Sequence, residues 1–264
     1  MPTLDPVDPE RLRAVAQGFG DDADRYDRAR PRYPDSLATA LLDGLPGRRV
    51  LDVGIGTGLS ALPFRAAGAT VSGVDPDPRM AELVRRRGFD VDVATFEEWD
   101  PAGRRFDAVV AGQTWHWVDP VAGAAKAAAV LDPGGRLAVF WNAGDPPPDL
   151  AAAFGEVHRR VDTGLPFALT AASQRDGYAG LLDRAEAGVR AAGGFGEPQR
   201  LRLDREEVVT RDAFLDRVPT SGGFSRIAPD RLAELLAGLG EAVDAVGGAF
   251  TMRWATLALV CPVA

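Results

Sequence analysis

Cysteine, histidine and lysine are scarce in this chain of 264 residues. Cys261 is the only cysteine, so the chain cannot close an internal disulfide, and we expect a reducing, cytoplasmic location. The longest apolar run, residues 254–264, is too short to span a bilayer. Without a cluster of cysteine and histidine we expect no metal, and without a G-x-S-x-G motif we expect no serine hydrolase.

Basic residues are also too few to balance the acidic ones. The chain has 30 arginine and lysine residues against 38 aspartate and glutamate residues, which gives a formal net charge of −8. An acidic surface is poorly suited to polyanions, so we expect no nucleic-acid and no membrane partner. The partner that we expect is a small molecule, bound by a monomer or a homodimer.

Short apolar runs alternate with helical patterns through the first half of the chain. The pattern predicts helices at 59–68, 78–88 and 120–131 between strands at 49–54, 70–75, 90–95, 105–112 and 136–143. Such alternation is typical of βαβ units and a parallel sheet. We therefore predict an α/β, Rossmann-like, doubly wound sheet.

The alternation stops at the proline-rich GDPPPD of residues 144–149, and helical patterns follow before strand-like segments return near the end. We interpret 1–264 as a single domain. Residues 1–45 would form N-terminal lid helices, 46–143 the cofactor-binding core, and 144–195 a helical cover inserted after the fifth strand. Residues 196–264 would complete a seven-stranded, mostly parallel sheet.

The segment VLDVGIGTGLS at residues 50–60 follows a predicted strand and precedes a predicted helix. Its glycines Gly54, Gly56 and Gly58 allow a sharp turn and the close approach of a ligand to the backbone. The spacing is G-x-G-x-G, not the G-x-G-x-x-G of dinucleotide-binding proteins, and the G-K-[ST] of a P-loop is missing. A turn of this kind also occurs without any ligand.

Asp75 ends the next predicted strand, 17 residues after Gly58. A carboxylate at this position can accept hydrogen bonds from both hydroxyls of a ribose. The alternative is a solvated acid that caps the helix beginning near Pro76. The pattern favours a ligand with a ribose and without a pyrophosphate.

These motifs, in this order, resemble the class I S-adenosylmethionine (SAM) dependent methyltransferases. The resemblance rests on VLDVGIGTG, VSGVD and FDAVVAGQTWHWVDP. A second spaced motif resembles the small-molecule branch of this family, near the trans-aconitate and quinone methyltransferases. It consists of Phe19, Ala23, Tyr26, Arg30, Pro31, Tyr33 and Pro34.

The resemblance implies a SAM site with S-adenosylhomocysteine as product. The glycine loop would pass under the methionine part, with Asp52 shaping its polar network and the carbonyl of Ala111 meeting the amino group. Asp75 would hold the ribose, and four residues would surround the adenine: Pro76, Met80, Phe96 and Glu97. Tyr26, Tyr33 and Arg30 would line the cofactor side, although Arg30 could equally form a surface ion pair.

The stretch GQTWHWVDP follows the fourth predicted strand, where doubly wound sheets expose their ligand side. His116 is a possible base or acceptor-orienting group, because its ordinary pKa of about 6.5 suits proton exchange near neutrality. Gln113, Trp115 and Trp141 are candidates for substrate contact. The alternative is that these side chains only pack; His158 is expected to be a solvated surface residue.

The leading hypothesis is an enzyme, a SAM-dependent methyltransferase that modifies an oxygen of a small-molecule acceptor. Carbon or nitrogen acceptors remain open, as does a protein that binds SAM without catalysis. A nicotinamide oxidoreductase and a nucleic-acid methyltransferase are further alternatives, against which the glycine spacing and the negative charge argue.

Overall fold

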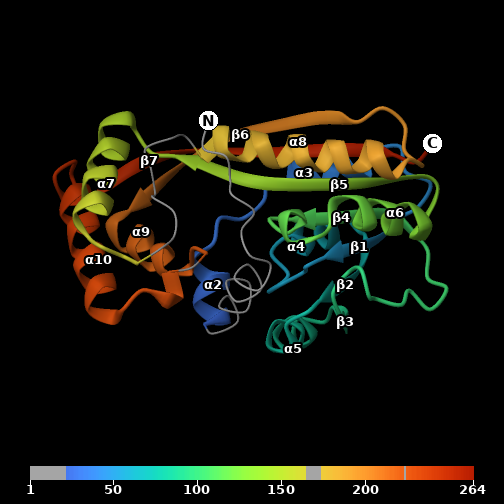
Figure 1. Cartoon of the computed structure of the whole chain (residues 1–264), viewed down its shortest axis with the longest axis horizontal. Coiled ribbons are helices and arrows are strands. Elements are labelled where there is room, and N and C mark those ends of the chain that lie inside the picture. The colour runs from blue at the N-terminus through green and yellow to red at the C-terminus, as the bar shows by residue number, and fades with distance from the viewer. Residues whose placement is uncertain (1–21, 165–173, 223) are drawn as a thin grey trace. The chain divides into compact units, whose positions relative to one another are not determined.

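The computed structural model describes residues 22–164, 174–222 and 224–264 (Figure 1). Phe19 and the other residues up to position 21 of the predicted N-terminal lid segment 1–45 lie outside these ranges. The chain divides into two compact units. The first holds the described residues among Met1–Arg30, Asp145–Ala172 and Glu206–Met252, and the second holds Pro31–Gly144, Ser173–Arg205 and Arg253–Ala264.

A seven-stranded sheet has the strand order β3-β2-β1-β4-β5-β7-β6. β1 is hydrogen-bonded in parallel to both β2 and β4, β2 to β3, and β4 to β5. The strands are β1 (Arg49–Val53), β2 (Thr70–Asp75), β3 (Asp90–Val93), β4 (Phe106–Gly112), β5 (Leu131–Asp145), β6 (Gln199–Thr210) and β7 (Ala249–Pro262). The order reverses at β1, which is the switch point of a doubly wound sheet.

β7 runs against the direction of β5. The amide of Val263, just past β7, donates to the carbonyl of Gly135 near the start of β5, at 2.9 Å. Thr256, earlier in β7, donates instead to the side chain of Asn142, near the end of β5. Partners that move in opposite directions along two strands define an antiparallel pair. The predicted seven-stranded, mostly parallel sheet is therefore confirmed.

β5 begins five residues earlier than the predicted strand at 136–143, because residues 132–135, left between that strand and the predicted helix at 120–131, are part of the strand. Gly134 has a φ of 80° in this stretch. The pairing of β4 with β5 also shifts its register between Phe106 and Ala108. An irregularity of this kind lets extra residues enter a strand without ending it.

The helices of the second unit begin where the sequence places caps. Asp77 accepts from the amide of Arg79 at the start of α5 (Pro78–Arg86), and Asp119 accepts from two amides at the start of α6 (Pro120–Val130). Each helix has proline at its first position, where no backbone N–H is needed. The other helices of this unit are α3 (Asp35–Leu42), α4 (Ala61–Ala66), the 3₁₀ helix η2 (Trp115–Trp117) and α8 (Gln174–Ala192).

The two faces of the sheet carry separate apolar cores. Along β4, Val109 and Ala111 belong to one core, and Ala108 and Val110 to the other, as the alternation of side chains in a strand requires. α8 packs against α6 and contributes three buried side chains to the first core: Leu182, Ala185 and Val189. Each large apolar side chain buried in this way stabilises the fold by about 1.5–3 kcal/mol.

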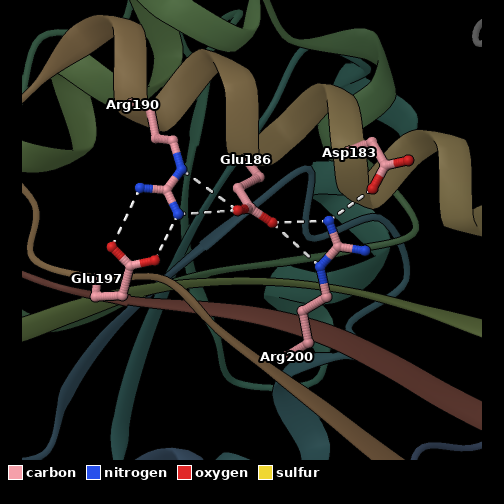
Figure 2. A network of polar contacts seen from close by, with 5 residues as sticks. All are labelled: Asp183, Glu186, Arg190, Glu197 and Arg200. Atoms are coloured by element: carbon pink, nitrogen blue, oxygen red, sulfur yellow. Dashed lines mark hydrogen bonds and ion pairs between the residues drawn. The ribbon is translucent and has the colours of Figure 1, made fainter.

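An ion-pair network fastens α8 to β6 at the edge of the sheet (Figure 2). Arg200 of β6 donates to Asp183 and Glu186 at 2.6 and 2.7 Å. Arg190, one turn after Glu186, bridges Glu186 and Glu197. The charges on this edge also oppose pairing with another strand.

The first unit is mainly helical in its described part. It contains α2 (Ala23–Ala29), α7 (Pro148–Arg160), α9 (Arg211–Arg217), η3 (Val218–Thr220), η4 (Phe224–Arg226) and α10 (Pro229–Asp244). α7 packs against α10, and α2 against α9. The rings of Phe154, Phe214 and Phe250 form its aromatic centre, with centroids 4.7–6.1 Å apart.

The segment 144–195, predicted as one helical cover, divides between the units, with α7 in the first and α8 on a face of the sheet in the second. The single-domain organisation stays a prediction. Within the described ranges, no helix has both the length and the apolarity needed to cross a membrane.

Candidate functional site

Three loops meet at the C-terminal edge of the parallel strands in the second unit. The glycine loop 54–58 follows β1, Asp75 ends β2, and residues 113–117 follow β4. Because β1 pairs in parallel with both neighbours, the three loops emerge on the same edge. Two hydrogen bonds join them: the hydroxyl of Thr114 donates to the carbonyl of Gly54 at 3.2 Å, and the amide of Gly56 donates to Asp75 at 2.8 Å.

The three glycines of the loop are required for different reasons. All have positive φ, at 65°, 55° and 91°, a backbone region that other residues rarely adopt. A Cβ on Gly54 would lie 2.2 Å from Thr114, and one on Gly58 would lie 2.9 Å from Val84. A Cβ on Gly56 would meet only open space out to 3.9 Å. The protein's own side chains therefore exclude a side chain at Gly54 and Gly58, whereas the space beside Gly56 is open.

Asp75 is bonded to the loops that surround it. One carboxylate oxygen accepts from the amide of Gly56, and the other accepts from the amide of Asp77 at 2.9 Å. The side chain is 7% exposed, and Asp77 is the residue that caps α5, so the reading of Asp75 as a solvated cap is wrong. A carboxylate offers about four lone-pair positions, so two more hydrogen bonds can be accepted. Burial raises the pKa of Asp75 to about 6, although the two amide bonds oppose it.

Asp52 lies beneath the same loop and is completely buried. The hydroxyl of Ser60 donates to its Oδ2 at 2.6 Å, while Oδ1 has no partner in the described part of the chain. Burial raises the pKa of Asp52 to about 7; the bond from Ser60 opposes this and the charge of Asp75 adds to it. A buried carboxylate oxygen without a partner is costly in a folded protein and is a natural acceptor for a cationic ligand.

Tyr33 lies near Ser60 at the start of the second unit. Its ring packs edge-on against Phe140, with centroids 4.9 Å apart. A Cβ on Gly112 would lie 2.9 Å from the Tyr33 hydroxyl oxygen and 2.8 Å from Ser60. The structure thus places Tyr33 beside the serine that holds Asp52.

The backbone leaves β4 through a strained residue. Gln113 has a φ of 56°, which is rare for a residue other than glycine and often marks a functional site. Its amide donates to the carbonyl of Phe140 at 2.8 Å, and its side-chain Nε2 donates to the carbonyl of Asn142 at 3.1 Å. These two bonds anchor the loop 113–117 to β5.

His116 lies in η2 and contacts the buried side chain of Trp141 in β5. Its Nδ1 accepts a hydrogen bond from the indole N–H of Trp141 at 3.3 Å, and its ring lies 4.6 Å from that of Trp117. Burial, together with the positive charge of Arg184 on α8, lowers the pKa of His116 to about 4. The imidazole is therefore neutral at pH 7.

Several predicted contact residues are parts of the core. Trp115 and Trp141 are buried in the same apolar cluster, and the ring of Phe96 packs between Trp115 and Trp99. Met80 is buried on the inner face of α5. Packing accounts for these side chains, and their contact with a ligand stays a prediction.

The remaining predicted residues of this unit lie in different settings. Ala111 is fully buried at the end of β4, and Pro76 is exposed just after β2. Glu97 is exposed and accepts from the amide of Asp119 at 2.8 Å, while its carbonyl accepts from Lys126. Glu97 is thus tied to the start of α6.

Tyr26 and Arg30 belong to the first unit, so their contact with a cofactor stays a prediction. The Arg30 guanidinium lies over the Tyr26 ring at 4.9 Å and donates to the carbonyl of Thr220 at 2.5 Å. His158 of α7, expected on the surface, is half-buried, and burial lowers its pKa.

Sequence reasoning missed Ser60, Thr114 and Asn142, which shape the site through contacts distant in the chain. Ser60 could have been found, because it directly follows the glycine loop. The bond of Thr114 to Gly54 joins residues 60 positions apart, and no local pattern signals it. In the described ranges no cluster of histidine, cysteine and acidic side chains could hold a metal ion.

Comparison with known proteins places residues 25–160 within the methyltransferase domain family. Over 136 residues the chain is 40% identical to an uncharacterised methyltransferase of Mycobacterium tuberculosis, a match that covers 50% of this chain and 55% of the relative. Over 105 residues it is 42% identical to a ubiquinone biosynthesis O-methyltransferase of Bradyrhizobium sp., covering 37% of this chain and 41% of the relative. The chain thus spans about half the length, or less, of the curated relatives it matches.

A solved structure from Anaeromyxobacter dehalogenans, described as that of a candidate type II methyltransferase, has the same fold. Its TM-score is 0.61 at 24% identity, and the match covers 88% of this chain and 97% of that one.

Proposed function

The chain belongs to the methyltransferase domain family, and from this premise we propose that it transfers the methyl group of SAM to an oxygen of a small-molecule acceptor. The oxygen would belong to a carboxylate or a hydroxyl group, and S-adenosylhomocysteine would be the second product. The name of the ubiquinone O-methyltransferase relative supports oxygen as the acceptor atom.

One observation carries the proposal: two buried carboxylates, Asp52 and Asp75, flank a glycine loop that has open space beside Gly56. SAM combines a cationic amino-acid part with a ribose, and the site offers the matching groups. The unpartnered Oδ1 of Asp52 suits the positive charge, and the spare acceptor capacity of Asp75 suits the two ribose hydroxyls.

The other cofactor contacts are assigned by the family resemblance. The carbonyl of Ala111 would accept from the amino group of SAM. Pro76 and Met80 would flank the adenine together with residues just after β3. Tyr26, Arg30 and Tyr33 would line the side of the site that binds the cofactor.

When bound, SAM supplies a methyl group on a sulfonium, which is already activated toward nucleophiles. The protein has to align the acceptor with the methyl–sulfur bond and exclude water, and such alignment contributes about 7–11 kcal/mol in well-oriented reactions. The anchored loop 113–117 is the element of the site that we assign to holding the acceptor.

Transfer of label from methyl-tritiated SAM to a panel of aromatic and aliphatic carboxylates and phenols tests the proposal. Asp75→Asn is expected to raise the KM for SAM at least tenfold, because an amide replaces one of the acceptor oxygens. The matched control is Asp132→Asn, a partly buried carboxylate at the opposite end of the strands that is bonded to Arg49 and Arg105. Absence of label on every acceptor, or equal effects of the two substitutions, would contradict the proposal.

A further inference from the structure

The bond between Trp141 and His116 determines which nitrogen of the imidazole carries the proton. An indole N–H can only donate, so the Nδ1 atom that accepts from it at 3.3 Å must be unprotonated. A neutral imidazole has one N–H, and in His116 it must therefore be on Nε2. Trp141 is fully buried, which holds its ring in place.

The surroundings of His116 keep it neutral. The pKa is lowered to about 4 by burial and by the positive charge of Arg184. In the described residues, its one hydrogen-bond partner is Trp141, and no carboxylate is bonded to it to stabilise an imidazolium. At neutral pH the group therefore presents a single donor, Nε2–H.

We propose that Trp141 is a positioning residue that fixes His116 as a hydrogen-bond donor, and that His116 holds an anionic oxygen of the acceptor instead of removing a proton from it. The inference rests on the proposed function and deepens it. It assigns the acceptor to carboxylates or to phenols that are ionised at neutral pH.

The chemistry balances without a base. An acceptor oxygen that is already negative uses its own electron pair to form the bond to the methyl carbon, while the electron pair of the sulfur–methyl bond stays on sulfur. The sulfonium and the oxyanion both become neutral, and no proton is released. A neutral hydroxyl would need a base, but Nε2 of His116 already carries a proton and Nδ1 is occupied by the indole.

Arg184 favours the same class of acceptor. It is exposed on α8, and its charge acts on His116 strongly enough to lower the pKa. The same positive charge attracts an anion that is bound to the imidazole. A cation such as an amine would be repelled at this position.

Long-range ¹H–¹⁵N correlation spectra of the imidazole nitrogens test the tautomer directly and need no activity. The chain has two histidines, so His158→Gln assigns the signals. We expect His116 in the Nε2–H form from pH 5.5 to 8.5, without titration. An Nδ1–H form, or titration near pH 6.5, would overturn the inference even if Trp141 variants do not fold.

Two tryptophan substitutions test the role of the indole. Trp141→Phe removes the donor and is expected to mix the tautomers or raise the pKa of His116. Trp115→Phe is the matched control, because Trp115 lies in the same core and its indole nitrogen has no partner in the described chain. Equal effects of the two substitutions on the His116 signals would contradict the positioning role.

Steady-state kinetics of His116 variants distinguish a hydrogen-bond donor from a general base. The measurements use the acceptor that the wild-type chain methylates best. His116→Gln keeps an N–H donor but cannot act as a base, and should retain kcat/KM within tenfold; His116→Phe should lose more than 100-fold. Loss of a general base would cost about 10²–10⁴-fold in both variants, and that result would refute the inference. A wild-type chain that does not bind S-adenosylhomocysteine would refute the proposed function itself. The tautomer spectra separate this failure from a failure of the inference about His116, because they need no cofactor.

Discussion

Replacing Asp52 with asparagine should flatten the dependence of stability on pH. Asp52 is completely buried, and its pKa is raised from 3.8 to about 7, mainly by burial. A carboxyl that binds its proton more tightly when folded contributes stability below its unfolded pKa of about 4, and this contribution is lost as the pH rises through its folded pKa of about 7. Asparagine does not titrate, so the variant lacks this loss.

The size of the effect follows from the pKa. One pKa unit corresponds to about 1.4 kcal/mol, and linkage between pH 5 and pH 8 gives a loss of about 2–3 kcal/mol in the free energy of unfolding of the wild-type chain from this residue. The asparagine Nδ2 at the position without a partner costs about 1–3 kcal/mol, but this cost is the same at every pH. Relative to the wild type, Asp52→Asn should therefore gain about 2–3 kcal/mol between pH 5 and pH 8.

Urea unfolding at pH 5, 6, 7 and 8, followed by tryptophan fluorescence, measures this difference. All five tryptophans lie in the second unit, as does Asp52, so the signal reports the unit that contains the change. Asp77→Asn is the control. Burial alone would raise the pKa of Asp77, but the bonds and charge of Arg79 outweigh burial and lower it, so Asp77 titrates below this pH range. Parallel curves for Asp52→Asn and the wild type would refute the reasoning.

Three further predictions follow from contacts in the second unit. Gly54→Ala should destabilise the chain by about 1–2 kcal/mol because of the positive φ at this position, and by about 1–3 kcal/mol more because the new methyl group clashes with Thr114. Gly56→Ala should cost only the first amount, and it should weaken binding of S-adenosylhomocysteine. Equal losses of stability for the two variants in urea unfolding would contradict this prediction. Thr256→Val removes the 2.6 Å bond to Asn142 and leaves a buried oxygen unpaired, so urea unfolding should show a loss of about 1–3 kcal/mol, and an unchanged stability would speak against that bond. Glu186→Gln, in the network of Figure 2, should lower Tm slightly in low salt and not in 1 M salt, because the network is exposed; a salt-independent loss in calorimetry would argue for packing instead.

Local sequence patterns were sufficient to predict the parallel half of the sheet. The predicted strands at 49–54, 70–75 and 105–112 match β1, β2 and β4 to within one residue at each end. Each is a short apolar run bounded by turn residues, and each following helix begins near a proline, an aspartate or the glycine loop. These signals act over a few residues, which is why one sequence is enough to show them.

The contacts that hold the site residues in place could not be predicted in the same way, because they join residues distant in the chain. Gly54 was predicted to lie against a ligand, and the structure adds a second reason for glycine there, because any side chain at this position would clash with Thr114, 60 residues later in the chain. His116 was predicted as a base or an acceptor-orienting group, and its hydrogen bond from Trp141, 25 residues away in the chain, has no local sequence signal. The positions of α7 and α8 depend on packing between distant helices, which no local pattern encodes. The cytoplasmic location, the monomeric or homodimeric state and the lack of a nucleic-acid partner stay predictions.

Calorimetric titration of the chain with S-adenosylhomocysteine tests the central claim most directly, because it needs no acceptor. The account predicts saturable binding of one molecule per chain in the micromolar range. Binding should be at least tenfold weaker for Asp75→Asn, and the folded state of each protein is checked by circular dichroism. A folded wild-type chain that shows no heat of binding at high micromolar concentrations would contradict the assignment of the glycine loop and both carboxylates to SAM.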